Sequence, residues 1–362
     1  NPEYKGKYEI STGNPDVTWE KKNSYNLGID TKFFKNQLSI SADIFKEDRN
    51  NILTKLETVS SLVGMSSSVL PPVNVGRMTN KGFEIEASYD GSAGTDWYWH
   101  IGGNFSYSVN RIKYMAEPSY AYEWMNTTGF AYGQYKAYYN EGFYNTAEEV
   151  ANHPHNDIDA NKVQAGDLKI VDVNGDGIID SKDIVPVGFS NIPRTTFGAD
   201  LSLSWKGLSI SLLFTGSAQG SFAMSDYLIV PFSQDQSSPL SYMTGRWTPE
   251  RYAAGEAITY PRMSVNTATS QNNGKNAFWI RSTDHLKLKN IELSYNFASL
   301  KGFSKTHISG LRIFFNANNL YTWCFGDLIG GIDPELTNDS TSTRGLIYPL
   351  TRVYNLGFNM EF

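Results

Sequence analysis

The sequence predicts an all-β fold, and three observations support this prediction. Aromatic residues are frequent, with 22 Tyr, 20 Phe and 8 Trp among 362 residues, whereas charged residues make up only 19%. Apolar and polar residues alternate along repeated segments, as they do in β-strands with two different faces. Short and long connections between these segments also alternate along the chain. Together these features favour an antiparallel transmembrane β-barrel over the half-buried sheets of a soluble β-sandwich.

Nine segments show the two-residue period that is typical of β-strands. The clearest are 82–90, 97–109, 197–205, 208–214 and 354–362, and the weaker ones are 19–33, 38–48, 278–297 and 308–318. Only Lys206 and Gly207 separate two of these segments, which predicts a tight hairpin. Within 278–297 the apolar phase slips between Leu288 and Ile291, which predicts a β-bulge.

The connections between the nine segments predict the orientation of the barrel. Short connections lie near 34–37, 91–96, 206–207 and 299–307, and long ones near 49–79, 112–193, 218–277 and 320–350. Outer-membrane barrels combine short periplasmic turns with long extracellular loops. The last strand is therefore expected to run towards the periplasm, and residues 1–17 to end an extracellular loop. Nine strands are too few for a large barrel, so further strands are expected before Asn1.

Charge and composition exclude several classes of protein. The chain has 31 Lys and Arg against 37 Asp and Glu, without a basic run, which argues against a nucleic-acid partner. A single cysteine, Cys324, excludes an intrachain disulfide and a cysteine-rich zinc site. No apolar stretch reaches the length of a transmembrane helix, but a transmembrane strand needs only about 9–11 residues. The chain starts at Asn1 without an initiator Met or a signal peptide, so we expect it to be part of a longer precursor.

Short motifs occur in a fixed order along nearly the whole chain. They are Gly13–Glu20 (GNPDVTWE), Asn80–Glu84 (NKGFE), Gly166–Lys169 (GDLK), Asp172–Gly177 (DVNGDG), Arg246–Glu250 (RWTPE), Trp279–Arg281 (WIR), Leu286–Asn290 (LKLKN) and Leu311–Leu320 (LRIFFNANNL). In this combination the sequence resembles the C-terminal barrel portion of the SusC/RagA-type TonB-dependent outer-membrane transporters. The resemblance extends from about residue 13 to Phe362.

The resemblance implies the architecture and partners of the whole protein. Residues 1–362 would form the last nine strands of a barrel with about 22 strands, with 112–193 and 218–277 as long extracellular loops. An N-terminal plug domain and a TonB-contacting segment are expected upstream of this chain. A SusD-like surface lipoprotein would cap the barrel, and the barrel-assembly machinery would recognise the terminal Phe362. Outer-membrane lipid would surround the strands.

The expected function is import of nutrient oligomers across the cell outer membrane, driven through TonB. Oligosaccharides are favoured as substrates and peptides are the second possibility. Two other interpretations remain open at this point: a secreted, calcium-stapled glycan-binding β-protein or adhesin, and a passive porin. Nucleophile, phosphate-binding and dinucleotide motifs are missing from the sequence. We therefore expect no enzymatic activity and no catalytic cofactor.

One segment matches the spacing of a calcium-binding loop. Hard oxygen ligands fall at positions 1, 3, 5, 9 and 12, with glycine at position 6 for the sharp turn. The predicted metal ligands are Asp172, Asn174, Asp176, the carbonyl of Ile178, Asp180 and Asp183. Asp at position 12 has a shorter reach than Glu, which predicts weak affinity. A bound Ca2+ would stiffen the 112–193 loop, and the alternative is an acidic turn without metal.

Aromatic residues in the long loops are candidates for substrate contact, because flat rings stack on the apolar faces of sugars. The predicted substrate residues are Tyr120, Tyr122, Trp124 and Trp247, with Tyr132, Tyr135, Tyr138 and Tyr139 as further candidates. The alternative is that these rings pack the long loops into a compact cap. The cluster of His153, His155, Asp157 and Asp159 is interpreted as a solvated loop, and His100 as a residue of the barrel lumen.

Overall fold

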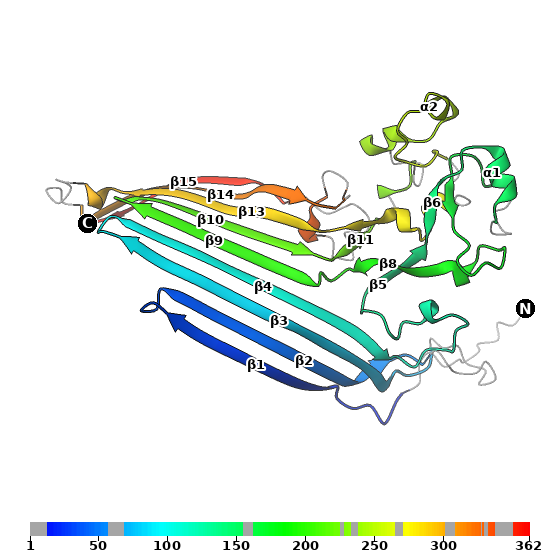
Figure 1. Cartoon of the computed structure of the whole chain (residues 1–362), viewed down its shortest axis with the longest axis horizontal. Coiled ribbons are helices and arrows are strands. Elements are labelled where there is room, and N and C mark those ends of the chain that lie inside the picture. Colours follow the sequence, from blue (N-terminus) through cyan, green and yellow to red (C-terminus); the bar gives the residue numbers. More distant parts are fainter. Residues whose placement is uncertain are drawn as a thin grey trace, which may run out of the picture. The chain divides into compact units, whose positions relative to one another are not determined.

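The computed structural model describes residues 13–56, 69–154, 162–224, 228–232, 238–264, 271–300, 308–326, 328, 332–336 and 350–362. Within these ranges one nine-stranded sheet follows the order of the chain (Figure 1). Its strands are β1 (Lys21–Phe33), β2 (Leu38–Thr54), β3 (Val73–Ala93), β4 (Trp97–Tyr114), β9 (Thr195–Trp205), β10 (Leu208–Ala218), β13 (His285–Asn296), β14 (Gly310–Cys324) and β15 (Val353–Glu361). This confirms the nine predicted strands and their sequential order.

The chain divides into two compact units, and the boundary crosses the first four strands. One unit comprises Asn1–Gly28, Asp43–Phe83 and Ser108–Tyr132. The other comprises Ile29–Ala42, Glu84–Tyr107 and Gly133–Phe362, so it contains the strands from β9 to β15.

The strands keep their alternating pattern, and their apolar side chains remain exposed. In β15, Leu356 is 79% exposed and Phe358 is 66% exposed. The residues that alternate with them, such as Asn355 and Asn359, are polar, and the Asn355 amide donates a hydrogen bond to Asn316 of β14 at 2.8 Å. An apolar outer band with polar inner residues is the pattern of a sheet that faces lipid on one side.

The hairpin between β9 and β10 is as short as predicted. Trp205 pairs directly with Leu208, so only Lys206 and Gly207 form the turn. Both have positive φ angles, 47° and 86°, as a type I′ turn requires. Beside this turn, the rings of Trp97 and Trp205 stack with centroids 5.4 Å apart.

The structure corrects the extent of several strands. Strand β3 covers Val73–Ala93 where 82–90 was expected, and β2 continues to Thr54 beyond residue 48. The extension of β2 begins with the polar residues Arg49, Asn50 and Asn51, so hydrophobic alternation cannot reveal it. The segment 278–297 is not one strand: it contains the short β12 (Ile280–Ser282), which pairs with β11 (Ser221–Ala223), and then β13.

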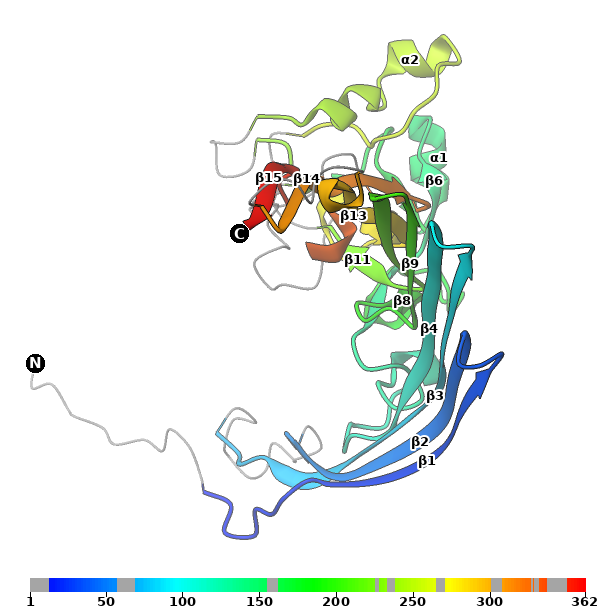
Figure 2. The ribbon, with the colours of Figure 1, turned by 90° about the vertical axis from the view of Figure 1, so that its left-hand side faces the viewer.

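The long connections after Tyr132 contain their own secondary structure, which we call the cap (described residues from Gln134 to Ser190 and from Ser221 to Ser282). Strand β5 (Gln134–Tyr138) pairs with β8 (Ile184–Ser190), and β6 (Asn140–Phe143) pairs with β7 (Leu168–Ile170). Two short helices are α1 (Ala147–Asn152) and α2 (Pro249–Ala253), both in the cap (Figure 2). No helix in the described ranges is both long and apolar enough to cross a membrane.

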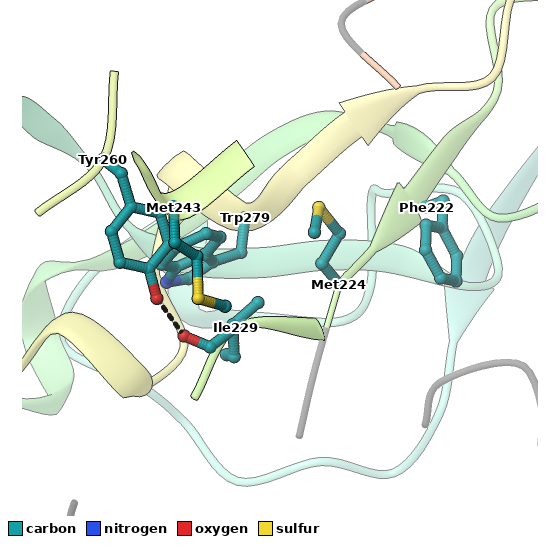
Figure 3. Close-up of a cluster of buried hydrophobic side chains, with 6 residues drawn as sticks. All are labelled: Phe222, Met224, Ile229, Met243, Tyr260 and Trp279. Atoms are coloured by element: carbon teal, nitrogen blue, oxygen red, sulfur yellow. Dashed lines mark hydrogen bonds between the residues drawn. The ribbon is translucent and has the colours of Figure 1, made fainter. Parts of the chain in front are cut away.

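The cap has a hydrophobic core of its own, shown in Figure 3. This cap core consists of Phe222, Met224, Ile229, Met243, Tyr260 and Trp279, all buried. The Tyr260 hydroxyl donates a hydrogen bond of 2.5 Å to the Ile229 carbonyl oxygen, which satisfies a polar group that would otherwise be costly to bury. Burial raises the pKa of the Tyr260 hydroxyl, so it stays protonated and keeps donating this bond. The described residues between Ser221 and Ser282 therefore pack around a core of their own.

Candidate functional site

A cluster of aromatic residues lies in the loop after β4. The rings of Tyr122 and Trp124 stack almost in parallel, with centroids 4.4 Å apart and 9° between the planes. Both side chains are half-buried, and Tyr120 is 36% exposed. The structure thus brings two of the predicted substrate residues together as a half-buried stack, in which each ring covers one face of the other. We call this stack the aromatic pair.

Glu117 closes the loop that carries the aromatic pair. Its carboxylate accepts hydrogen bonds from the backbone N–H groups of Thr127 and Thr128, at 2.6 and 2.7 Å. Partial burial alone would raise the pKa of Glu117, but the hydrogen bonds from Thr128 and Thr127 outweigh it and lower the pKa. The ionised carboxylate therefore holds both ends of residues 117–128 together. The sequence pattern did not reveal this role.

Trp247, the fourth predicted substrate residue, is buried in the cap. It is only 8% exposed and lies over Gly166, where a Cβ atom would come within 2.4 Å of the indole ring. Its backbone N–H donates to the carbonyl of Tyr260 at 2.8 Å. In this structure Trp247 packs the cap, which is the alternative role considered for the loop aromatics.

The remaining loop tyrosines differ in exposure. Tyr132 is 57% exposed and Tyr139 is 53% exposed, whereas Tyr135 and Tyr138, both in β5, are half-buried. Burial raises the pKa of Tyr135 and Tyr138, so both stay protonated at neutral pH. Sequence alone could not separate these two groups, because all four belong to the same aromatic-rich stretch.

The predicted calcium loop is a tight, internally hydrogen-bonded turn. Asp172 accepts hydrogen bonds from the N–H groups of Gly175 and Gly177, at 2.7 and 2.8 Å. Both glycines have positive φ angles, 73° and 82°, which only glycine adopts without strain. Asp183 is fully buried and accepts from the N–H of Val173 at 2.8 Å. The acidic side chains therefore stabilise the backbone of the loop.

A lysine ammonium lies among the other predicted metal ligands. Lys182 Nζ is 3.0 Å from Asp176 and 3.2 Å from Asp180. Hydrogen bonds, the one from Lys182 foremost, lower the pKa of Asp176. Asn174 Oδ1 accepts from the Asp176 N–H at 2.9 Å, and the Ile178 N–H donates to Asp176 at 3.0 Å. Within the described ranges no group of three or more His, Cys, Asp or Glu side chains is placed to hold a metal ion. The calcium site stays a prediction.

A buried ionic network joins the two halves of the cap, and no sequence pattern indicates it. Asp167 is 1% exposed and receives the Arg262 guanidinium, with the Nη2 donor 3.0 Å from Oδ2. The Asn272 amide donates to the other Asp167 oxygen at 2.7 Å. The Asn272 carbonyl in turn accepts from Trp279 Nε1 at 2.6 Å. These partners lie far apart in sequence, so no local spacing could predict their meeting.

His100 lies on the polar face of β4 between two carboxylates. Its Nδ1 atom is 2.7 Å from a carboxylate oxygen of Asp90 on β3, and its Nε2 atom is 2.7 Å from a carboxylate oxygen of Asp200 on β9. Gly102 leaves room for this arrangement, because a Cβ atom there would come within 2.6 Å of Asp200.

His153 contacts the Tyr144 hydroxyl at 2.9 Å. Its predicted neighbours His155, Asp157 and Asp159 lie outside the described residues, so the interpretation of that cluster stays a prediction.

The C-terminal Phe362 directly follows β15 and is 86% exposed. Exposure of the last aromatic ring is compatible with recognition by an assembly factor and with contact to lipid. Its proposed role as an assembly signal stays a prediction.

Comparison with protein families gives one match that covers most of the chain. The family described as "TonB dependent receptor-like, beta-barrel" matches residues 2–320. Among curated proteins, TonB-dependent receptor P26 of Formosa agariphila is 25% identical over 96% of this chain. TonB-dependent receptor SusC of Bacteroides thetaiotaomicron is 20% identical over 96% of it. The chain spans about a third of the length of these relatives, 35% and 32%.

Comparison with solved structures shows the same fold. The structure titled RagAB peptide transporter superposes with a TM-score of 0.71 and 22% identity, covering 97% of this chain and 36% of the matched chain. A second RagAB structure, titled a peptide importer in an "open-open" state, gives 0.70. These relatives are receptors and transporters and not enzymes. They support neither the soluble β-protein nor the passive porin.

Proposed function

Because the chain belongs to the TonB dependent receptor-like β-barrel family, we propose that the full-length protein imports nutrient oligomers as a SusC/RagA-type transporter. The observation that carries this proposal is the family match over residues 2–320. The superposition with the RagAB structure, which covers 97% of this chain, supports the same fold. Members of this family reside in the outer membrane, and so does this protein. The exposed apolar face of the strands supplies the contact with outer-membrane lipid.

The transport cycle that we propose needs parts beyond this chain. Energy would reach the barrel through the TonB complex, which would act on an N-terminal plug domain. A SusD-like surface lipoprotein would close over the extracellular loops and trap substrate. The nine strands and the cap would supply the wall and the outer loops, with the barrel-assembly machinery inserting the protein.

Oligosaccharides are the substrate class that we propose first. The aromatic pair supports this choice, because it places two half-buried aromatic rings in a long loop, and such rings stack on the apolar faces of sugars. Trp247 is not part of the proposed contact surface, since it is buried. Peptides are the second candidate, because the RagAB structures with the same fold are titled peptide transporter and peptide importer.

The test uses the full-length protein with its lipoprotein partner, purified in detergent and titrated calorimetrically with defined oligosaccharides and, separately, with peptides of similar length. We expect oligosaccharide binding, and we expect Trp124→Ala to weaken it about tenfold because a stacked ring is lost. Tyr252→Ala is the matched control, because Tyr252 of α2 is an exposed cap tyrosine that is not among the candidate substrate residues, and it should leave affinity unchanged.

This titration and an uptake assay in cells separate the alternatives. Binding of peptides alone would overturn the oligosaccharide proposal and keep the transporter. Uptake by cells that persists after TonB is deleted would overturn the TonB-driven mechanism itself.

A further inference from the structure

A β-bulge in β13 lies at Lys289, which contacts the same carboxylate as Lys287. In the pairing of β10 with β13, Phe214 faces Leu288 and Leu213 faces Asn290, so Lys289 has no partner residue. The pairing of β13 with β14 shifts at the same residue. This is the predicted bulge, and it confirms the phase slip seen in the sequence. Bulges redirect side chains locally, and here Lys287 and Lys289 reach the same carboxylate.

Lys287 is the most deeply buried lysine of the described residues, with its side chain 1% exposed. Its ammonium group donates to both carboxylate oxygens of Asp333 at 3.0 Å and to Glu335 at 2.8 Å. Lys289 donates to the same Glu335 oxygen at 2.8 Å. The cluster contains two ammonium groups and two carboxylates, so its formal charges balance.

Asp333 and Glu335 belong to the connection between β14 and β15, and their carboxylates contact Lys287 of β13. The 3-10 turn Pro334–Leu336 follows Asp333, whose carboxylate accepts from the Glu335 N–H at 2.9 Å. Burial alone would raise the pKa of Glu335, but the hydrogen bonds from Lys287 and Lys289 outweigh it and lower the pKa. The carboxylate is therefore ionised at neutral pH, as the two ion pairs require.

The same connection also reaches the cap. Leu328 and Ile332 pack against the cap core that contains Met243 and Trp279. We call the described residues Leu328 and Ile332–Glu335 the strap. Apolar contacts hold one part of the strap to the cap, and buried ion pairs hold its other part to β13. Breaking one side of a buried ion pair is strongly unfavourable, because the remaining charge is left without a partner.

We propose that Lys287 and Lys289 fasten this strap as a latch between the cap core and strand β13. The strap is then held in a fixed position beside β13. The significance for import rests on the proposed function, because only in a transporter does a fixed strap restrict the path of a substrate. The latch itself is a property of the fold and is tested separately.

The test measures how fast a cysteine in the strap reacts with a maleimide coupled to polyethylene glycol. Ile332→Cys is introduced into the full-length protein together with Cys324→Ser, since Cys324 is exposed, in a background without other reactive cysteines. Cysteine suits a half-buried apolar position. We expect slow labelling in this parent, and at least about tenfold faster labelling when Lys287→Met is added, because strap opening exposes the thiol.

Two further variants test whether loss of the ion pairs causes the faster labelling. Exchanging the charges with K287D and D333K should slow labelling to at least about threefold below the Lys287→Met rate, because the ion pair with position 333 is restored in reverse. Recovery should be incomplete, because Glu335 loses its bond from Lys287 and keeps only the one from Lys289. Arg312→Met is the matched control, since Arg312 pairs with Glu292 on neighbouring strands and does not contact the strap. It should leave the rate unchanged.

The proposal is overturned if Lys287→Met labels at the parental rate while unboiled protein still migrates as a folded barrel, or if Arg312→Met accelerates labelling equally. If Lys287→Met does not reach the membrane, Lys289→Met replaces it, because Lys289 is 37% exposed and makes one ion pair. It should accelerate labelling about threefold, and no acceleration overturns the proposal. Labelling does not depend on substrate, so its outcome is independent of whether oligosaccharide uptake is found.

Discussion

The nine-stranded sheet and the cap bury their apolar side chains in opposite ways. In the sheet, large apolar residues such as Leu356 and Phe358 are 79% and 66% exposed, because lipid is their solvent. In the cap, Met243 and Trp279 are 0% and 2% exposed, as in the interior of a water-soluble domain. The sheet therefore depends on backbone pairing and membrane, whereas the cap depends on packing and buried polar networks.

This difference implies that the two regions can be damaged independently. A substitution in the cap core should loosen the cap and leave the barrel inserted. A substitution on the apolar face of a strand should impair insertion. The predictions below use this separation, from the largest expected effect to the smallest.

The largest effect is expected for Trp279→Ala, at the centre of the cap core. Loss of a buried Trp leaves a cavity and removes the hydrogen bond to the Asn272 carbonyl, which should cost the cap about 3–5 kcal/mol. Limited proteolysis should then cut the cap, while unboiled protein still migrates as a folded barrel. Trp19→Ala is the control, because Trp19 is 87% exposed and should have no such effect. Loss of the barrel together with the cap would contradict the separation.

A somewhat smaller effect is expected for Leu356→Arg on the apolar face of β15. A charged side chain facing lipid should cost about 2–4 kcal/mol near the membrane centre. The fraction of protein that inserts into lipid vesicles should fall. Asn355→Arg places the same charge on the polar face one residue away and should cost much less. Equal losses for both variants would mean that the two faces do not differ in environment.

A modest effect is expected for Glu117→Gln, which weakens the closure of the loop bearing the aromatic pair. The folded loop lowers the pKa of Glu117, so its contribution to stability is present above about pH 4.5 and is lost as the pH falls through the lowered pKa. Loss of the charge should cost about 1 kcal/mol, because the site is partly solvated. Hydrogen exchange of the Thr127 and Thr128 amides should accelerate in the variant at pH 7. In the wild type it should accelerate, relative to the intrinsic rate, only at acid pH.

The smallest effect concerns the acidic loop around Lys182. If Ca2+ binds there, it must compete with the Lys182 ammonium for Asp176 and Asp180. Replacing the lysine in Lys182→Gln should therefore increase the protection from proteolysis that added Ca2+ gives to residues 172–183. Lys206→Gln, at a hairpin distant in sequence, is the control. Absence of calcium protection in both wild type and Lys182→Gln would exclude the predicted metal site.

The sheet was predictable because its information is local. A two-residue period marks each strand, and the slip before Ile291 marks the bulge at Lys289. Prediction failed where the pattern was absent or interrupted. The polar end of β2 around Arg49 does not alternate, and the two strands β12 and β13 are separated only by Thr283 and Asp284.

The site was less predictable because its contacts are non-local. Tyr122 and Trp247 are equivalent in a list of loop aromatics, but one is partly exposed and the other is buried over Gly166. The Asp167–Arg262 pair and the Lys287–Asp333 pair each join segments far apart in the chain. No spacing rule connects such partners, since tertiary packing alone brings them together.

The stacked rings of Trp97 and Trp205 have a spectroscopic consequence. Two indoles with centroids 5.4 Å apart couple their electronic transitions, so the pair should give a split near-ultraviolet or far-ultraviolet circular dichroism signal that neither ring gives alone. The rings meet only when β4 pairs with β9, which lie on either side of the first half of the cap in sequence. The appearance of this signal during refolding would therefore time the closure of that long-range pairing, without any added label.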